Sequence, residues 1–179
     1  STYRDRTTGV AVEQLTCHRG HSHHFYFTNP GWYAGGGKLL VASDRHDRTN
    51  LYGVDLATGA IEQLTDLDPV PLPRELEFIR ACRNPLRDEA VFWHDLKLMC
   101  LDLSTRELRV LHETDPRWCV SMTNCSADGR YAYWGSWEDQ SGDFEVDLLR
   151  GYVGFRETWA AKPLSRIERV ELASGRHEV

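Results

Sequence analysis

The sequence lacks several features that would indicate a function at once. Its net charge is −6 and no run of Lys or Arg stands out, although a nucleic-acid partner requires a clustered basic surface. No apolar stretch approaches the roughly 20 residues of a membrane helix, and Ser1–Asp5 has no apolar core of the secretory type. A serine-nucleophile elbow, a glycine-rich phosphate loop and a CxxC pair are also missing. We therefore expect neither nucleic acid nor a membrane as a partner.

The cysteines lack the number and the spacing of a disulfide framework. The five cysteines are an odd number, and four of them lie among apolar or aromatic neighbours. They are Cys17, Cys82, Cys100, Cys119 and Cys125. This usage is typical of buried free thiols in a reducing compartment rather than of a disulfide framework. We therefore predict a cytoplasmic protein.

What the sequence does contain is a repeat. Segments 50–65, 98–112 and 166–179 alternate apolar and polar residues with a period of two, turn at a short polar sequence, and resume the alternation. This pattern predicts β-hairpins, with glycine supplying a positive φ in two of the three turns. An acidic residue precedes each turn, as Asp55, Asp102 and Glu171.

The spacing of these hairpins predicts the fold class. A period of roughly 45 residues with four strands per unit is typical of a β-propeller blade. We therefore predict an all-β chain of about three four-stranded blades, at 17–66, 67–116 and 117–179. The third repeat is longer, which predicts an insertion at 138–163, where the alternation breaks. Residues 8–16 repeat the pattern of 58–65 and are predicted to form an orphan outer strand.

Twelve strands are predicted within the three blades. They are 23–28, 38–43, 50–55 and 60–65 in the first, 77–82, 89–93, 97–102 and 107–112 in the second, and 119–124, 130–135, 165–171 and 176–179 in the third. Since a propeller closes with at least about four blades, we expect the remaining blades of the ring to lie outside this chain.

One edge of the predicted blades gathers histidine. In a propeller, the loop before the first strand and the loop between the second and third strands open on the same side, next to the central channel. Six of the eight histidines map to this edge, as His18, His21, His23, His24, His46 and His94. His112 and His177 lie on outer strands instead, and we expect them to be structural or exposed.

Structural roles compete with functional ones at this edge. His23 and His24 are adjacent on a strand, so their side chains point to opposite faces and only one can face a given site. His21 and His23 share a face, but two imidazoles without a third ligand do not form a metal site. Tryptophans at the edge could stack on sugars or fill the core.

Several segments resemble the oligogalacturonate lyase family. They are 17–30 (Cys-His-Arg-Gly-His-Ser-His-His-Phe-Tyr-Phe-Thr-Asn-Pro), 39–45, 56–66, 150–157 (Arg-Gly-Tyr-Val-Gly-Phe-Arg-Glu) and 161–166. The resemblance runs along essentially the whole chain as the N-terminal portion of the family. It implies a seven-bladed propeller that cleaves short oligogalacturonides by β-elimination, during pectin degradation in the cytoplasm. It also implies a divalent metal, typically Mn²⁺, whose ligands lie outside this chain, so the chain alone is expected to be inactive.

The chemistry of β-elimination suggests roles for the edge residues. Removing the proton next to a uronate carboxylate requires a cation to neutralise the carboxylate and a base of near-neutral pKa. We predict that His24 or His46 handles the proton or contacts sugar hydroxyls, and that Arg45 is the carboxylate ligand. Further substrate-binding candidates are His21 and, as a platform for a sugar ring, Tyr133 and Trp134. Arg83 and Arg19 are weaker candidates for a carboxylate ligand. Two alternatives remain open, namely a propeller that binds carbohydrate or protein without catalysis, and the propeller domain of a serine peptidase.

Overall fold

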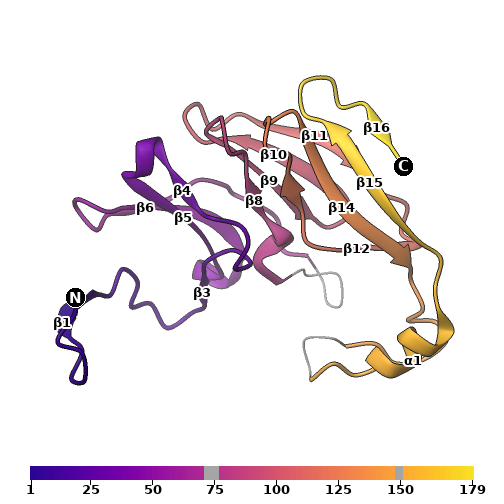
Figure 1. The fold of residues 1–179 in the computed structure, drawn as a ribbon, viewed down its shortest axis with the longest axis horizontal. Coiled ribbons are helices and arrows are strands. Elements are labelled where there is room, and N and C mark those ends of the chain that lie inside the picture. Colours follow the sequence, from indigo (N-terminus) through magenta and orange to yellow (C-terminus); the bar gives the residue numbers. More distant parts are fainter. Residues whose placement is uncertain (71–76, 148–150) are drawn as a thin grey trace. The chain divides into compact units, whose positions relative to one another are not determined.

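The computed structural model describes residues 1–70, 77–147 and 151–179 (Figure 1). The described residues form antiparallel β-sheets with one α-helix and three short 3-10 helices, which confirms the predicted all-β class. The chain divides into two compact units. The first comprises 1–24 and 31–68, and the second comprises 25–30 and 69–179.

The first unit contains one antiparallel sheet. Its strand order is β3-β5-β6-β7, and β4 pairs with the same strand β5 as β3 does. The strands are β3 (Ser22–His23), β4 (Trp32–Tyr33), β5 (Lys38–Ser43), β6 (Asn50–Asp55) and β7 (Ile61–Gln63). Val41, Tyr52 and Val54 form a small core with Leu15, Leu39 and Ile61 packed against it.

The predicted first strand, 23–28, is wrong beyond its first residue. The chain leaves the sheet after β3 and returns as β4, and the segment Phe25–Pro30 belongs to the second unit. Pro30 has no N–H group to give to a strand ladder. In the second unit, the buried Asn29 donates from Nδ2 to the carbonyl oxygen of Thr123 at 3.0 Å. The segment Phe25–Pro30, which interrupts the predicted strand, therefore makes a structural contact through Asn29.

The N-terminal residues form a separate two-stranded hairpin. β1 (Thr2–Arg4) pairs with β2 (Ala11–Glu13). A strand, β2, is therefore present within the predicted range 8–16, but it is not an orphan, because it pairs with β1, which the residue pattern does not predict.

The second unit contains two sheets. One has the order β11-β10-β9-β8 and the other has β12-β14-β15-β16, with β13 also paired to β14. The strands are β8 (Cys82–Arg83), β9 (Glu89–His94), β10 (Lys97–Asp102), β11 (Leu108–Glu113), β12 (Trp118–Val120), β13 (Asn124–Cys125), β14 (Tyr131–Glu138), β15 (Ser165–Glu171) and β16 (His177–Glu178). The core between these two sheets includes Trp93, Trp134, Leu98 and Val170.

The first strands of these two sheets also differ from the prediction. Residues predicted as strand 77–82 form a 3-10 helix, η3 (Glu77–Arg80), before the short β8. Ile79 and Arg80 have φ values of 44° and 47°, and a left-handed backbone cannot continue a strand. The predicted strand 119–124 is split into β12 and β13, which both pair with β14.

The insertion connects β14 to β15 and carries the α-helix. α1 (Phe155–Ala161) follows Gly154, which has a φ of 79°. Figure 1 shows α1 beyond the ends of β14 and β15, away from the body of the sheet. Residues 148–150 of the predicted insertion lie outside the described residues. No helix among the described residues is long and apolar enough to cross a membrane.

One acidic turn recurs along the chain and explains the repeat. Asp55 accepts a hydrogen bond on Oδ1 from the N–H group of Thr58 at 2.9 Å. Asp102 and Asp5 accept equivalent bonds in their own hairpins, and Asp5 was not recognised from the sequence. Hydrogen bonds to Asp102, first that of the Ser104 hydroxyl, lower the pKa of its carboxyl group to about 2.

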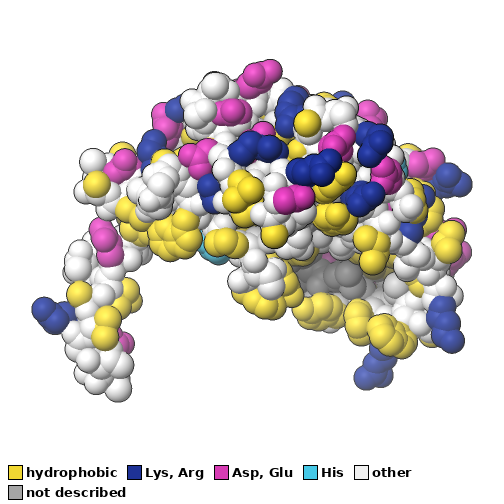
Figure 2. All heavy atoms as spheres, turned by 45° about the horizontal axis from the view of Figure 1, so that its top comes forward, with side chains coloured by type: hydrophobic (Ala, Val, Ile, Leu, Met, Phe, Trp, Pro, Cys, Tyr) yellow, Lys and Arg dark blue, Asp and Glu magenta, His cyan; other side chains and the backbone are white. Residues whose placement is uncertain are grey.

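The charged side chains of the second unit are mixed. Arg130 pairs with Glu171 at 3.2 Å, and Arg176 pairs with Glu178 at 3.1 Å. Figure 2 shows basic and acidic side chains interspersed on the face it draws, rather than gathered by sign.

All five cysteines are free thiols, with Cys82 and Cys100 buried.

Candidate functional site

The second-to-third strand loop of the first sheet carries Arg45 and His46. Both lie in the 3-10 helix η2 (Arg45–Asp47), and His46 and Asp47 have left-handed φ values of 62° and 57°. His46 is exposed. The guanidinium carbon of Arg45 lies 5.8 Å from the ring centroid of Tyr52. Burial raises the pKa of Tyr52, and the charge of Arg45 opposes this effect.

Two histidines of segment 17–30, the His-rich segment, stack on each other. The ring centroids of His21 and His23 are 5.4 Å apart with an angle of 10° between the rings, as expected for residues that share one face of a strand. The Ser43 hydroxyl donates to the carbonyl oxygen of His21 at 2.6 Å. This bond joins the start of the segment to the end of β5.

His24 has a contact that restricts its chemistry. Its Nε2 accepts a hydrogen bond from the N–H group of Gly31 at 3.2 Å. The lone pair of Nε2 is therefore occupied, and the imidazole connects the two ends of the segment that leaves the sheet. A proton acceptor role for His24 would have to use Nδ1.

Asp44 was not assigned a role from the sequence, but the structure places it against the His-rich segment. The N–H group of Gly20 donates to Nδ1 of His18 at 2.9 Å. A Cβ atom at Gly20 would lie 2.3 Å from Oδ1 of Asp44. A larger residue at position 20 would displace the carboxylate of Asp44, so the loop before β3 and the loop after β5 meet here.

Two predicted substrate ligands of the second unit are poorly placed. Arg83 ends β8 beside the turn to β9, and its Nη2 pairs with Oδ1 of Asp88 at 2.9 Å. That turn is at the opposite end of β9 from the loop at His94. Trp134 is only 2% exposed and packs edge-on against Trp93 with centroids 5.4 Å apart. A ring buried in the core cannot stack on a sugar, so the prediction for Trp134 is wrong.

Tyr133 lies on the other face of β14 and is half-buried. It is paired in register with Arg169 on β15. A hydrogen bond with Tyr133, and then one with Glu178, raise the pKa of Arg169. Tyr133 therefore belongs to a polar cluster on the sheet face.

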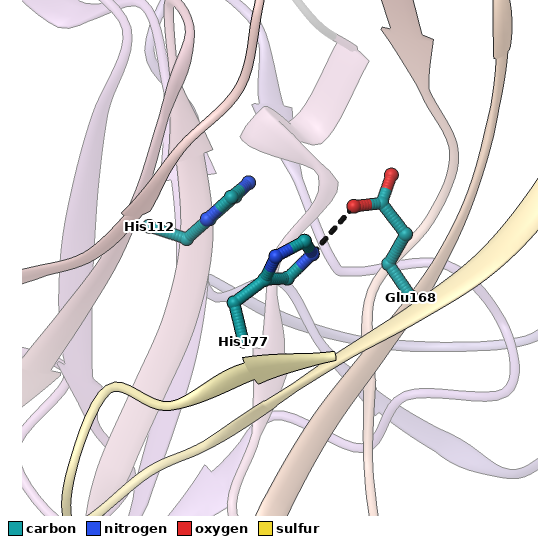
Figure 3. Close-up of side chains that lie close together, drawn as sticks. All are labelled: His112, Glu168 and His177. Carbon is teal, nitrogen blue, oxygen red and sulfur yellow. Dashed lines mark hydrogen bonds and ion pairs between the residues drawn. The ribbon is translucent and has the colours of Figure 1, made fainter. Parts of the chain in front are cut away.

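A cluster of His112, Glu168 and His177 emerges only from the structure. Figure 3 shows His112 beside His177, whose Nε2 is 2.6 Å from Oε2 of Glu168. The potential ligand atoms of the three residues lie within 4.8 Å of one another, and they are the one such group among the described parts of the chain. His112 comes from β11 and the other two come from the neighbouring sheet.

The geometry of this cluster does not fit a metal ion. The rings of His112 and His177 stack with centroids 4.0 Å apart and an angle of 24°, whereas a metal lies in the ring plane at roughly 2.1 Å from the nitrogen. One ion cannot satisfy both stacked planes. Glu168 is also already bonded to His177, to Ser136 and to the guanidinium of Arg166. Divalent manganese prefers oxygen ligands. The cluster is therefore a hydrogen-bonded network.

Comparisons with known proteins place the fold. The chain matches an oligogalacturonate lyase solved in complex with manganese, with 26% identity and a TM-score of 0.83, over 100% of this chain and 46% of that one. It matches an oligogalacturonate lyase from Vibrio parahaemolyticus with 23% identity and a TM-score of 0.80, over the same shares. The predicted resemblance is thus confirmed in structure, and the chain spans about half the length of these lyases.

Other propeller proteins match less well. TolB from Acinetobacter baumannii matches with 16% identity and a TM-score of 0.56, over 99% of this chain and 36% of that one. Peptidase structures match at 16% identity with TM-scores of 0.53 and 0.54. No family model matches the sequence, and no curated protein does. These likenesses support the β-propeller architecture.

Proposed function

We propose that this chain forms part of a seven-bladed β-propeller that cleaves short oligogalacturonides by β-elimination, in cytoplasmic pectin degradation. The observation that carries the proposal is the structural likeness of the whole chain to an oligogalacturonate lyase in complex with manganese. Because the chain spans 46% of that lyase, the activity is assigned to the complete ring, and the chain by itself is expected to be inactive.

An exposed sheet face supports the presence of a further blade. On β14, Ala132, Trp134 and Ser136 point to one face and are buried. The opposite face includes Gly135, whose partner in register on β15 is Ile167, and Ile167 is 76% exposed. The sheets of a propeller are arranged radially around one axis, so an inner sheet has neighbours on both faces. A further blade would cover Ile167.

We assign the reaction chemistry to the first sheet. Arg45 binds a uronate carboxylate, and His46 takes the proton from the carbon next to that carboxylate, because its imidazole is exposed. The electron pair of the broken C–H bond then forms a carbon–carbon double bond, and the bond to the leaving glycosidic oxygen breaks. The leaving oxygen takes up a proton from water, and His46 later returns its proton to the solvent. His21 contacts sugar hydroxyls, and His24 positions the loop.

A bound divalent metal such as Mn²⁺ would supply positive charge that stabilises the anion next to the carboxylate. We place its ligands outside this chain, because the stacked rings of His112 and His177 do not fit an ion. The residues of this chain then bind and orient the sugar acid, which accounts for an edge that carries arginine and histidine in an acidic protein.

The test uses the full-length protein, digalacturonate and added Mn²⁺. The unsaturated product absorbs in the ultraviolet, so cleavage gives a rising absorbance. His46→Gln should reduce turnover roughly a hundredfold without changing the melting temperature. Lys38→Gln, at the opposite end of β5, is the matched control and should be unchanged. A folded protein that produces no unsaturated product with Mn²⁺ would rule the proposal out.

The alternatives give different results in the same experiment. A propeller that only binds sugars would bind digalacturonate, as measured by calorimetry, and leave it intact. The propeller domain of a peptidase would belong to a full-length protein that hydrolyses chromogenic peptides and ignores the sugar acid.

A further inference from the structure

Arg166 lies at the edge of the third sheet, where the insertion returns to it. It is the second residue of β15. Its guanidinium carbon lies 3.7 Å from the ring centroid of Trp118. Trp118 begins β12 and is paired in register with Glu138, the last residue of β14. Two segments far apart in the sequence therefore build one corner of the sheet.

The guanidinium of Arg166 is held in one orientation. Its Nε donates to Oε1 of Glu168 at 3.0 Å and to the hydroxyl of Ser136 at 3.1 Å. The side chain of Glu168 is fully buried, and its other oxygen contacts His177 at 2.6 Å. A carboxylate on one edge and an indole on one face thus fix the plane of the guanidinium. Arginine suits both contacts, because its planar group can pair with a carboxylate and stack on an aromatic ring.

The fixed guanidinium keeps unused donors. All hydrogen bonds of Arg166 with the described residues use Nε, so the N–H groups of Nη1 and Nη2 have no acceptor in the described part of the chain. The side chain is 27% exposed. The nearby carboxylate of Asp115 accepts from Nε and N–H of Arg117 instead. The outer fork of Arg166 is therefore open to a ligand.

We propose that the Nη1 and Nη2 groups of Arg166 bind the carboxylate of a galacturonate residue, a subsite that rests on the proposed function. Two parallel N–H donors match the two oxygens of a carboxylate. Trp118, Ser136 and Glu168 are positioning residues that hold the fork in place. Because the side chain is fixed before the ligand arrives, binding loses little side-chain entropy.

An arginine with a purely structural role would have a different pattern. It would use its terminal nitrogens to satisfy buried carbonyl groups, as Nη1 of Arg109 does with the carbonyl oxygen of Leu172 at 2.6 Å. Arg166 uses only its inner nitrogen for the fold. Its terminal nitrogens remain for another molecule.

The test compares an acid with its neutral ester in the full-length protein. Calorimetry measures the affinity for digalacturonate and for its methyl ester, which lacks the charged carboxylate. The wild type should prefer the acid. Arg166→Gln should weaken acid binding roughly tenfold to a hundredfold and leave the affinity for the ester unchanged. Arg166→Lys should recover only part of the preference, because lysine keeps the charge and lacks the fork.

Loss of Arg166 leaves Glu168 buried beside fewer donors, so a second variant is needed. The double variant Arg166→Gln/Glu168→Gln removes both charges together, and its melting temperature should stay close to that of the wild type. Its acid preference should fall by the same factor as that of the single variant, and the remaining preference is assigned to Arg45. Arg176→Gln is the matched control, since it removes one exposed arginine charge and should leave both affinities unchanged.

The outcomes separate this subsite from the proposed function. If the wild type cleaves digalacturonate and the double variant keeps the full acid preference of the wild type, the subsite at Arg166 is overturned and the proposed function stands. If the wild type binds neither ligand and produces no unsaturated product, the proposed function is overturned and the subsite with it.

Discussion

The imidazole rings of His112 and His177 stack with centroids 4.0 Å apart, although they belong to different sheets. His112 is the residue before the last in the outer strand of one sheet, and His177 begins the outer strand of the next. His177 is also bonded to the buried Glu168. Two stacked imidazoles can both be neutral at little cost, whereas two protonated rings at this distance repel each other.

Stability should therefore fall in mild acid. Burial, and then the proximity of His177, lower the pKa of His112 below its ordinary value of 6.5. Below pH 6.5 the unfolded state therefore binds more protons than the folded state. The contribution of His112 to the free energy of unfolding is complete above pH 6.5 and is lost as the pH falls through the lowered pKa. Glu168 opposes this effect, as Glu113 does more weakly, and Arg166 adds to it.

The measurement is the free energy of unfolding in urea between about pH 7.5 and about pH 5.5. His112→Gln removes the titrating ring, so its stability should depend less on pH across this range. The same slope in variant and wild type would mean that His112 is not the group responsible.

The same stacking predicts an outcome for metal binding. Because the ring planes do not converge on one point, His112→Gln and His177→Gln should leave the Mn²⁺ stoichiometry and affinity of the full-length protein unchanged. Calorimetric titration with MnCl₂ measures both, and His18→Gln serves as a control at an exposed histidine. Loss of one bound ion in either variant would show that the rings rearrange to hold it.

The sequence predicts some parts of this fold well. The strands at 38–43, 50–55, 97–102 and 165–171 have the predicted bounds. In the last three, the acidic residue before the turn marks the end of the strand. The first strand of each predicted blade is less well predicted. The left-handed backbone at Ile79 and Arg80 has no glycine to signal it.

The candidate site was likewise predictable only in part. The His-rich edge follows from strand order, so His46 and Arg45 could be located from the sequence. The network of His112, Glu168 and His177 depends on how two sheets pack, which no local pattern encodes. The prediction places Trp134 at the loop edge because the predicted strand ends at 135, whereas β14 extends to Glu138 and the buried side chain of Trp134 points into the core.

Arg106 occupies a turn position where the other hairpins have glycine. Its φ is 66°, compared with 72° for Gly59 and 71° for Gly175, and its N–H group donates to the carbonyl oxygen of Asp102 at 2.8 Å. A side chain in this region strains the backbone by roughly 1–2 kcal/mol, and the unfolded-state entropy of glycine offsets part of that strain.

Arg106→Gly should therefore raise the free energy of unfolding by up to about 1 kcal/mol. Gly59→Ala, the reverse change in the equivalent turn, should lower the free energy of unfolding by about 1 kcal/mol. This loss would come from backbone strain alone, because a Cβ at Gly59 meets no other atom within 4 Å. Urea unfolding at neutral pH measures both. A destabilised Arg106→Gly would show that contacts of the arginine side chain outweigh the backbone strain.

Asn29 provides the last test, because it anchors a segment that the sequence predicts as a strand. Asn29 is 5% exposed, and its Nδ2 donates to the carbonyl oxygens of Thr123 at 3.0 Å and Ala81 at 3.5 Å. Asn29→Ala leaves these acceptors unsatisfied and should cost about 1–3 kcal/mol of unfolding free energy. Asn124→Ala, at an exposed neighbour of Thr123, should change it by less than about 0.5 kcal/mol. Equal stability of the two variants would mean that Phe25–Pro30 is held by its apolar contacts alone.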